Sequence, residues 1–386
     1  MKSGRCVIHS ASVVSGGTVL DDGWVEFDDG RIIATGSGGS WRALARLDTA
    51  EVVDGGKGWL TPGLIDIHCH GGGSASFDDG PDSVAIALAM HRYHGTTRSV
   101  LSLVTADLAQ LTHRVEAIAD LAAGDETILG SHLEGPFLNR RHKGAHDPSL
   151  LRNPDGAAVE TLLEAGRGTI CQITLAPELP GGIRSVSSFV EAGIAVAVGH
   201  SDADYAKARE AFDAGASILT HAFNAMKGLH HREPGPVGAA IGTPHVTLEV
   251  VNDGVHLHPD VVRVAFDAAP GRIAFVTDAM AAAGAEDGEY RLGSLGVTVS
   301  EGVARLTDGG AIAGSTLTLD ASLRRAVQQL GIALPAAVQA LTETPARAIG
   351  RSRDLGRLDP GFAADAVLLD AGLQVKKVWA AGHRVR

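Results

Sequence analysis

The stretch GLIDIHCHGGG, residues 63–73, decides how the centre of this chain folds. An apolar run ends there in a His-Cys-His triplet, which three glycines follow. Side chains alternate between the two faces of a β-strand, so Asp66, His68 and His70 are expected on one face, with Cys69 and the isoleucines on the other. The segment is therefore predicted to be a strand that packs through its apolar face and presents two imidazoles on its polar face.

The size and composition of the chain are those of an ordinary globular protein. It has 386 residues, of which 45% are hydrophobic and 20% are charged. This length allows two or three domains, or one barrel with an addition. No apolar stretch approaches the roughly 18 to 20 residues that a membrane helix needs, and the N-terminus lacks the apolar core of a signal peptide. The three scattered cysteines do not form a disulfide framework, so a cytoplasmic protein is predicted.

The net charge restricts the kinds of partner. Acidic residues outnumber basic ones, 45 to 33, which gives a net charge of −12. Neither nucleic acid nor a membrane is expected as a partner, because a phosphate backbone needs a basic surface. A small anionic ligand is compatible with this charge, since one or two local cations and a few backbone amides are enough to bind it.

The two ends of the chain differ in pattern from its middle. Short strand-like segments with Gly and Asp turns fill residues 5–54, and the C-terminal residues 365–370 and 374–386 have the same pattern. Both termini are therefore predicted to build one small β-sandwich domain from residues 1–59 and 351–386.

The middle of the chain, residues 60–350, alternates apolar strand-like runs with amphipathic helical stretches. The eight strand candidates are residues 63–70, 96–104, 127–137, 169–178, 194–201, 216–224, 246–254 and 272–280. Apolar strands that alternate with helices indicate a parallel sheet covered on its faces, and eight such units favour an α/β fold of the (β/α)8 TIM-barrel type. A doubly wound open sheet is the alternative, but no G-x-G-x-x-G turn follows the first strand.

Polar side chains stand where six of the eight strands end, the face at which barrel enzymes carry their chemistry. These residues are His68, His70, Glu134, His200, His221, His256 and Asp278. Imidazoles and carboxylates together suit zinc, iron or a similar divalent metal, and the lack of clustered cysteines argues against a structural zinc site. His68 and His70 are expected to hold one ion, and Glu134 could bridge to a second ion held by His200 and His221.

Several motifs together resemble the N-acetylglucosamine-6-phosphate deacetylase family of the amidohydrolase superfamily. They are PGLIDIHCHG (62–71), LEGPFL (133–138), KGAH (143–146), GHS (199–201), THAFNAM (220–226), REPG (232–235), NDGVH (252–256), TDAM (277–280), IAGS (312–315) and GRLDPGFAADAVLLD (356–370). The similarity runs from about residue 5 to the C-terminus. Because H-x-H alone is common in the superfamily, the resemblance depends on the combination of LEGPF, H-x-F-N-A-M, REPG and TDAM.

The resemblance implies a metal-dependent hydrolysis that removes the N-acetyl group from N-acetyl-D-glucosamine 6-phosphate and gives D-glucosamine 6-phosphate and acetate. Glu134, His200 and His221 would hold the main metal, and His68 with His70 would make a second site. Asp278 would take a proton from metal-activated water and give it to the leaving amine, while His256 polarises the acetyl carbonyl.

The resemblance also implies residues that contact the sugar phosphate. Arg232 would reach the phosphate in the neighbouring active site of a homodimer, because a guanidinium offers paired donors to phosphate oxygens. The remaining positions are Ala145, His146, Asn224, Ala225 and the loop Ile312, Ala313, Gly314 and Ser315.

Other families of enzymes share some of these motifs. Dihydroorotases and hydantoinases bridge their metals with a modified lysine from the fourth strand, but residues 169–178 contain no lysine. Nucleoside deaminases share H-x-H and leave Glu134 and Arg232 without a role. A deacetylase for the galactosamine 6-phosphate epimer is the closest alternative. A catalytically silent binding protein is not expected, because every ligand and acid/base position is filled.

Overall fold

A computed structural model describes residues 4–44 and 49–386, and the chain divides into two compact units. The terminal unit comprises residues up to Asp66, His91–Arg98 and Leu319–Arg386. The barrel unit comprises Ile67–Met90 and Ser99–Thr318. The domain boundaries predicted after residues 59 and 350 stay a prediction. Among the described residues, no helix combines the length and the hydrophobicity that crossing a bilayer requires.

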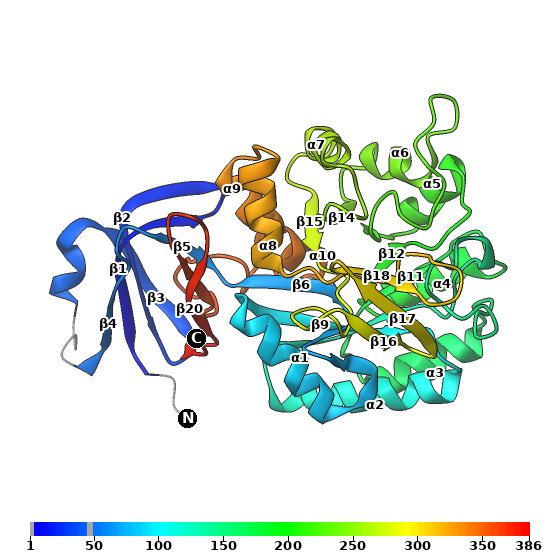
Figure 1. Ribbon diagram of the computed structural model, residues 1–386, viewed down its shortest axis with the longest axis horizontal. Helices are drawn as coiled ribbons and strands as arrows, with labels where there is room; N and C mark the ends of the chain where they lie inside the picture. The colour runs from blue at the N-terminus through cyan, green and yellow to red at the C-terminus, as the bar shows by residue number, and fades with distance from the viewer. Residues whose placement is uncertain (1–3, 45–48) are drawn as a thin grey trace. The chain divides into compact units, whose positions relative to one another are not determined.

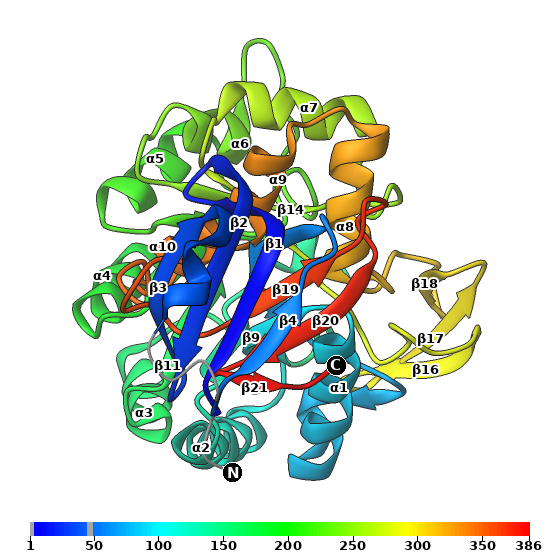
Figure 2. The same cartoon turned by 90° about the vertical axis from the view of Figure 1, so that its left-hand side faces the viewer.

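The terminal unit contains one eight-stranded sheet to which both ends of the chain contribute, as the sequence predicts (Figure 2). Its strands are β1 (Cys6–Ser15), β2 (Thr18–Asp28), β3 (Arg31–Ser37), β4 (Glu51–Asp54), β5 (Trp59–Pro62), β19 (Ala366–Leu369), β20 (Val375–Ala380) and β21 (His383–Arg384). The antiparallel pairing of β5 with β19, in which Leu60 lies opposite Leu368, joins the N-terminal strands to the C-terminal ones. Phe27 and Trp379 pack edge to face in the core of this sheet.

The second eight-stranded sheet is parallel and follows the chain order predicted from the sequence (Figure 1). Its strands are β6 (Leu64–Cys69), β9 (Thr96–Val104), β10 (Ile128–Glu134), β11 (Ile170–Leu175), β12 (Ala195–Val198), β13 (Ile218–Leu219), β14 (Thr247–Val251) and β15 (Ile273–Val276). The backbone N–H of Asp278 donates to the carbonyl of His68 at 2.8 Å, which brings the end of the last strand back to the first. The predicted (β/α)8 barrel is therefore confirmed as a nearly closed barrel.

Helices follow the barrel strands, and several begin at an aspartate. They are α1 (Pro81–Tyr93), α2 (Leu108–Gly124), α3 (Gly156–Gly166), α4 (Gly182–Glu191), α5 (Tyr205–Asp213), α6 (Gly235–Ile241) and α7 (Pro259–Ala268), and the terminal unit adds α8 (Leu319–Arg324), α9 (Leu334–Leu341) and α10 (Glu343–Ala348). The carboxylates of Asp107, Asp155 and Asp204 each accept a hydrogen bond from a backbone N–H in the first turn of α2, α3 and α5. Such caps satisfy donors that a helix leaves free at its start.

A small antiparallel sheet is inserted after the last barrel strand. It consists of β16 (Gly288–Leu292), β17 (Leu295–Ser300) and β18 (Val303–Leu306). Separate short elements lie elsewhere in the barrel unit: β7 (Gly71–Gly72), β8 (Ala75–Ser76) and the 3₁₀ turns η3 (Phe77–Asp79) and η4 (Arg140–His142). The apolar face of the inserted sheet packs with Ala145, Met280 and Ala313 in one cluster. This packing positions the loops that follow β10 and β15.

A buried ion pair connects distant segments of the terminal unit. The Nε atom of Arg98 lies 2.6 Å from Oδ2 of Asp365, and Oδ1 of Asp365 accepts a hydrogen bond from the N–H of Ala381 at 2.7 Å. Both side chains are almost fully buried. Removing one partner would leave an uncompensated charge in a place that water does not reach.

We expect Arg98→Met to lower the free energy of unfolding by about 3 to 5 kcal/mol, since the Asp365 carboxylate would remain buried without its guanidinium. Urea denaturation followed by circular dichroism measures this loss. The matched control is Arg152→Met, which breaks the exposed pair between Arg152 and Asp155 and should cost at most about 1 kcal/mol. Equal effects of the two substitutions would contradict the assignment.

Candidate active site

The polar residues predicted at the strand ends meet at one mouth of the barrel. His68 and His70 come from the end of β6 and Glu134 from the last position of β10, while His200, His221 and Asp278 follow β12, β13 and β15 by two residues each. The last three have positive φ angles of 48°, 26° and 48°. Such left-handed backbone is unfavourable for residues other than glycine and is typical of functional sites.

Glu134, His200 and His221 form the first group. Oε1 of Glu134 lies 3.1 Å from Nε2 of His200 and 3.3 Å from Nε2 of His221, and the two nitrogens are 3.0 Å apart. All three residues are buried. Their ligand atoms are close enough to bind one ion together.

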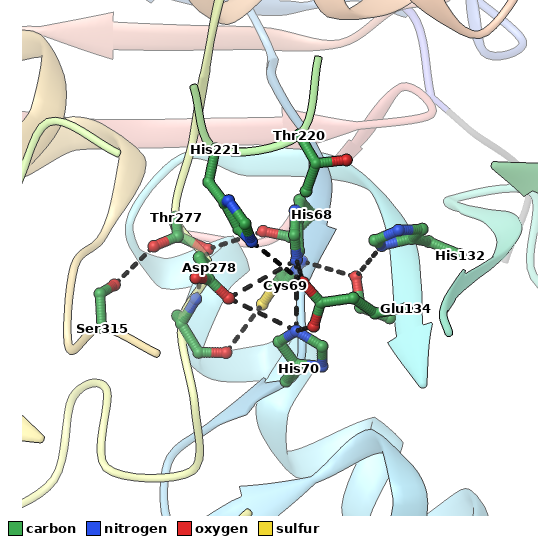
Figure 3. Close-up of polar contacts among 12 residues, drawn as sticks. His68, Cys69, His70, His132, Glu134, Thr220, His221, Thr277, Asp278 and Ser315 are labelled. Carbon is green, nitrogen blue, oxygen red and sulfur yellow. Dashed lines mark hydrogen bonds and ion pairs between the residues drawn. The ribbon is translucent and has the colours of Figure 1, made fainter. Parts of the chain in front are cut away.

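His68, His70 and Asp278 form the second group, which shares Glu134 with the first. Oδ1 of Asp278 lies 3.5 Å from Nε2 of His68 and 3.4 Å from Nε2 of His70. Oε2 of Glu134 lies 3.2 Å from Nε2 of His70, so one carboxylate faces both groups. Figure 3 shows these side chains pointing toward one another. The sequence predicts Asp278 as an acid/base, and the structure also places it within ligand distance of His68 and His70.

The donor set fits a divalent metal ion. Nδ1 of His200 lies 2.8 Å from the carbonyl oxygen of His142, and Nδ1 of His68 lies 2.9 Å from Oε2 of Glu249. Each contact places the ring proton on Nδ1, because the partner only accepts, and leaves the lone pair of Nε2 facing the group in the neutral ring. Nitrogen and carboxylate oxygen ligands of this kind suit zinc or iron.

The charges of the cluster support one another. Burial lowers the pKa of His70, but hydrogen bonds to Asp278 and Glu134 outweigh it and raise the pKa to about 10. Burial raises the pKa of Asp278, yet the nearby His68 and His70 hold it well below its usual range. The pKa of Glu134 is also lowered, against burial, by His68 and His146. The carboxylates are therefore ionised and attract cations, either protons on the imidazoles or a metal ion.

A cavity of about 320 Å³ opens at this mouth, and most of the predicted site residues line it. They are His70, Glu134, Ala145, His146, His200, His221, Asn224, Ala225, His256, Asp278, Ile312 and Gly314. Nε2 of His146 lies 3.3 Å from Oε2 of Glu134. His68 is fully buried and does not line the cavity.

His256 enters the cavity from the loop after β14 and is paired with Asp253. Nδ1 of His256 lies 2.7 Å from Oδ2 of Asp253, and Oδ1 of that carboxylate accepts the backbone N–H groups of Val255 and His256 at 2.8 Å. Burial lowers the pKa of His256, but the hydrogen bond to Asp253 and its charge raise it overall. The paired Nδ1 leaves Nε2 as the atom that can serve a ligand.

Three predicted substrate residues lie outside the cavity lining. Arg232 is exposed in the loop before α6, and its backbone N–H donates to Nδ1 of His230. Ala313 is fully buried. Ser315 is buried too: its N–H donates to the carbonyl of Asp278 at 2.7 Å and its hydroxyl donates to the carbonyl of Thr277, so it holds the backbone at Asp278.

The structure places at the site several residues that the sequence predictions do not include. Glu249 is buried beside His68, and His132 packs its ring on the ring of His68 with the centroids 4.5 Å apart. Strand alternation could have identified His132, because it is two residues before Glu134 and therefore on the same face of the strand. Glu249 could have been identified as the single acidic residue within the apolar run VTLEVV. Arg141 and His142 line the cavity from η4, within the basic run RRHK (140–143).

Comparison with known proteins agrees with this fold. The model of the amidohydrolase family matches residues 59–385, and the chain belongs to that family. The chain is 40% identical, over 84% of its length and 87% of the relative, to an N-acetylgalactosamine-6-phosphate deacetylase of Escherichia coli O157:H7. It is 36% identical, over 87% of its length and 85% of the relative, to an N-acetylglucosamine-6-phosphate deacetylase of Vibrio furnissii.

A solved structure matches the whole chain. It is a mutant of N-acetyl-D-glucosamine-6-phosphate deacetylase from Mycobacterium smegmatis in complex with N-acetyl-D-glucosamine 6-phosphate. The two chains are 39% identical and superpose with a TM-score of 0.93 over 99% of each. The chain is therefore an amidohydrolase whose relatives include deacetylases of both amino sugar epimers.

We expect Glu134→Gln to weaken zinc binding at both groups by more than about a hundredfold. Loss of a residue that only hydrogen-bonds to a metal ligand already lowers metal affinity 10- to 100-fold, and the Glu134 carboxylate itself faces both groups. Titration of metal-free protein with Zn²⁺ against a competing chelator measures the affinities. The control Glu178→Gln changes a carboxylate that binds Ser201 and the backbone of Asp202 instead, and it should retain both ions. Zinc bound equally well by both variants would refute the role of Glu134.

Proposed function

We propose that this protein hydrolyses the N-acetyl group of N-acetyl-D-glucosamine 6-phosphate to give D-glucosamine 6-phosphate and acetate. The observation that carries the proposal is the convergence of Glu134, His200 and His221 beside Asp278 on one cavity. The name of the Vibrio furnissii relative, and the substrate named in the Mycobacterium smegmatis complex, indicate the same reaction.

Glu134, His200 and His221 would hold the main divalent cation, zinc or iron, and His68, His70 and Asp278 a second one. Such a cation supplies two effects when bound: it lowers the pKa of water from 15.7 to about 7, and it withdraws charge from a carbonyl oxygen. The protein positions the acetyl group against this cluster and supplies the groups that transfer protons.

Asp278 is the proposed general base and then the general acid. Protonated His68 and His70 hold its pKa well below the usual range. A bound cation would provide the positive charge in their place, so the carboxylate stays ionised and can accept a proton from the attacking water. The oxygen of that water forms a bond with the acetyl carbon. The C–N bond then breaks, and the leaving nitrogen takes the proton from Asp278 to become the amine of glucosamine 6-phosphate.

His256 is the proposed donor to the acetyl oxygen. Asp253 fixes its Nδ1, so the proton on Nε2 of the imidazolium faces the cavity. A donor placed where negative charge develops lowers the energy of the transition state more than that of the substrate. The donor form is the protonated ring, which Asp253 favours.

The sugar and its phosphate are proposed to contact the rest of the cavity. Ala225 would offer its backbone amide beside Asn224, whose own N–H donates to the carbonyl of His221 at 3.0 Å. Ala145 and His146 would line the cavity around the sugar, and Ile312 and Gly314 of the loop 312–315 would close over it. Arg232 is exposed and outside the cavity lining of its own chain, which supports a role in the neighbouring active site of a homodimer. The galactosamine 6-phosphate epimer is the second candidate substrate, because one of the relatives acts on it by name.

We expect acetate release from N-acetylglucosamine 6-phosphate to exceed that from the unphosphorylated sugar by at least about a hundredfold in kcat/KM, since two charge-assisted phosphate contacts contribute about 3 kcal/mol. An acetate assay on zinc-loaded protein measures both rates, and N-acetylgalactosamine 6-phosphate is the third substrate. No acetate from any of the three would end the proposal, and a faster rate on the galactosamine epimer would reassign the substrate.

Two variants give this assay its controls. Asp278→Asn should lose turnover, because it keeps the shape but cannot take a proton. Arg232→Ala should weaken the preference for phosphorylated sugars while leaving the rate on the unphosphorylated sugar unchanged, since that sugar has no phosphate for the guanidinium to bind.

We expect kcat/KM to fall as the pH rises through the raised pKa of His256. The proposed donor is the protonated ring, which predominates below that pKa and is lost above it. In Asp253→Asn an amide replaces the charge that raises this pKa, while burial still lowers it, so the basic limb of the pH–rate profile should move to lower pH. Zinc content should not change, since neither residue belongs to the two ligand groups. A basic limb that stays in place would contradict the pairing of Asp253 with His256.

A further inference from the structure

Glu249 is a fully buried carboxylate in the middle of β14, and the catalytic proposal gives it no role. It is absent from the cavity lining, so it does not meet a substrate. Burial of a carboxylate is strongly unfavourable unless its partners compensate for the lost water. The partners of Glu249 therefore indicate what it does.

These partners connect the two ligand groups. Oε2 of Glu249 accepts from Nδ1 of His68 at 2.9 Å and from the backbone N–H of His221 at 3.3 Å. Oε1 accepts from Nε2 of Gln172 at 2.7 Å, which fixes the plane of the carboxylate. The carbonyl of Glu249 also accepts from the N–H of Ala222 at 2.7 Å.

The contact with His68 controls which ring nitrogen can bind a metal. An acceptor at Nδ1 keeps the proton there, so Nε2, which faces Glu134 and Asp278, carries the lone pair in the neutral ring. A charged acceptor also makes the ring a stronger ligand. The neighbouring His132 does not take this place, because its nitrogens bond to Ser102 and Thr174, both at 2.8 Å.

The first group depends on Glu249 much less. His200 has its own acceptor in the carbonyl of His142, and His221 meets Glu249 only through a long backbone contact. A change at Glu249 therefore acts mainly on the group that contains His68.

We infer that Glu249 is a positioning residue that enables the second group, His68, His70 and Asp278, to hold its own metal ion. The inference rests on the metal-binding part of the proposed function, and it is independent of the substrate. According to this inference, Glu249 determines whether the chain holds one ion or two, although its side chain contacts neither the substrate nor a metal ion.

The test is zinc stoichiometry in Glu249→Gln and Glu249→Leu. Metal-free protein is dialysed against buffered Zn²⁺ over a range of free concentrations, and bound zinc per chain is measured. Wild type should bind two ions. Both variants should bind the second ion 10- to 100-fold more weakly, with the leucine variant at the upper end because the glutamine oxygen can still accept from His68. The first ion should bind with unchanged affinity.

Three further proteins control this test. His68→Asn removes the ligand itself and should reproduce the one-ion state. Asp320→Asn changes a buried carboxylate of the terminal unit that also faces a histidine Nδ1, that of His94 at 3.2 Å, and should retain two ions. Gln172→Leu leaves the Glu249 charge but removes the amide that orients it. It should weaken the second ion by a smaller factor, and it keeps the test decisive if the Glu249 variants do not fold.

The inference is overturned if the Glu249 variants bind two ions as wild type does, if they lose both ions in parallel, or if wild type binds a single ion at saturating zinc. These results are separate from the fate of the proposed function. A chain with a Glu249-dependent second ion that releases no acetate refutes the deacetylase and keeps the inference. If the chain releases acetate but its second ion binds equally well without Glu249, the deacetylase proposal is supported and the inference is refuted.

Discussion

The carboxylate of Glu134 stands at the centre of the site, and the structure is organised around the need to hold nitrogen atoms close to it. Nε2 atoms of His68, His70, His146, His200 and His221 lie within 3.1 to 3.4 Å of its oxygens. Imidazole lone pairs in contact repel one another unless a cation lies between them. Only a rigid support can hold them in this state, and the parallel strands of the nearly closed barrel provide it.

Much of this arrangement can be predicted from the sequence, because strand alternation is a local property. The segment with His68 and His70 is a strand as expected, with both imidazoles directed to the cluster. Strand ends in a parallel barrel share one face, so residues as far apart as Glu134 and Asp278 could be predicted to meet. The helices after β6 and β9 also form in the amphipathic stretches between the predicted strands.

Other parts depend on contacts that no local pattern encodes. Ser315 has the expected place in a loop, yet its backbone pairs with Asp278 across 37 residues of chain, so it supports the acid/base and does not face the cavity. Glu249 meets His68 across 181 positions, and that contact depends on the relative height of β6 and β14 in the barrel. Register between distant strands is set by closure of the whole sheet, which a single segment does not specify.

A layer of hydrogen-bonded polar side chains inside the barrel explains how the site can be rigid although its interior is polar. His132 links Ser102 to Thr174, and Thr174 bonds to Thr220 at 2.8 Å. Hydroxyl groups from the alternate strands β9 and β11 and from the residue after β13 therefore form a connected layer next to His68. A buried polar network is costly when partly satisfied, and it rigidifies the core when its members find partners. The apolar residues that alternate with these hydroxyls supply the packing on the outer face of the same strands. The barrel therefore separates its two tasks by strand face: one holds the fold together, and the other holds the ligands in place.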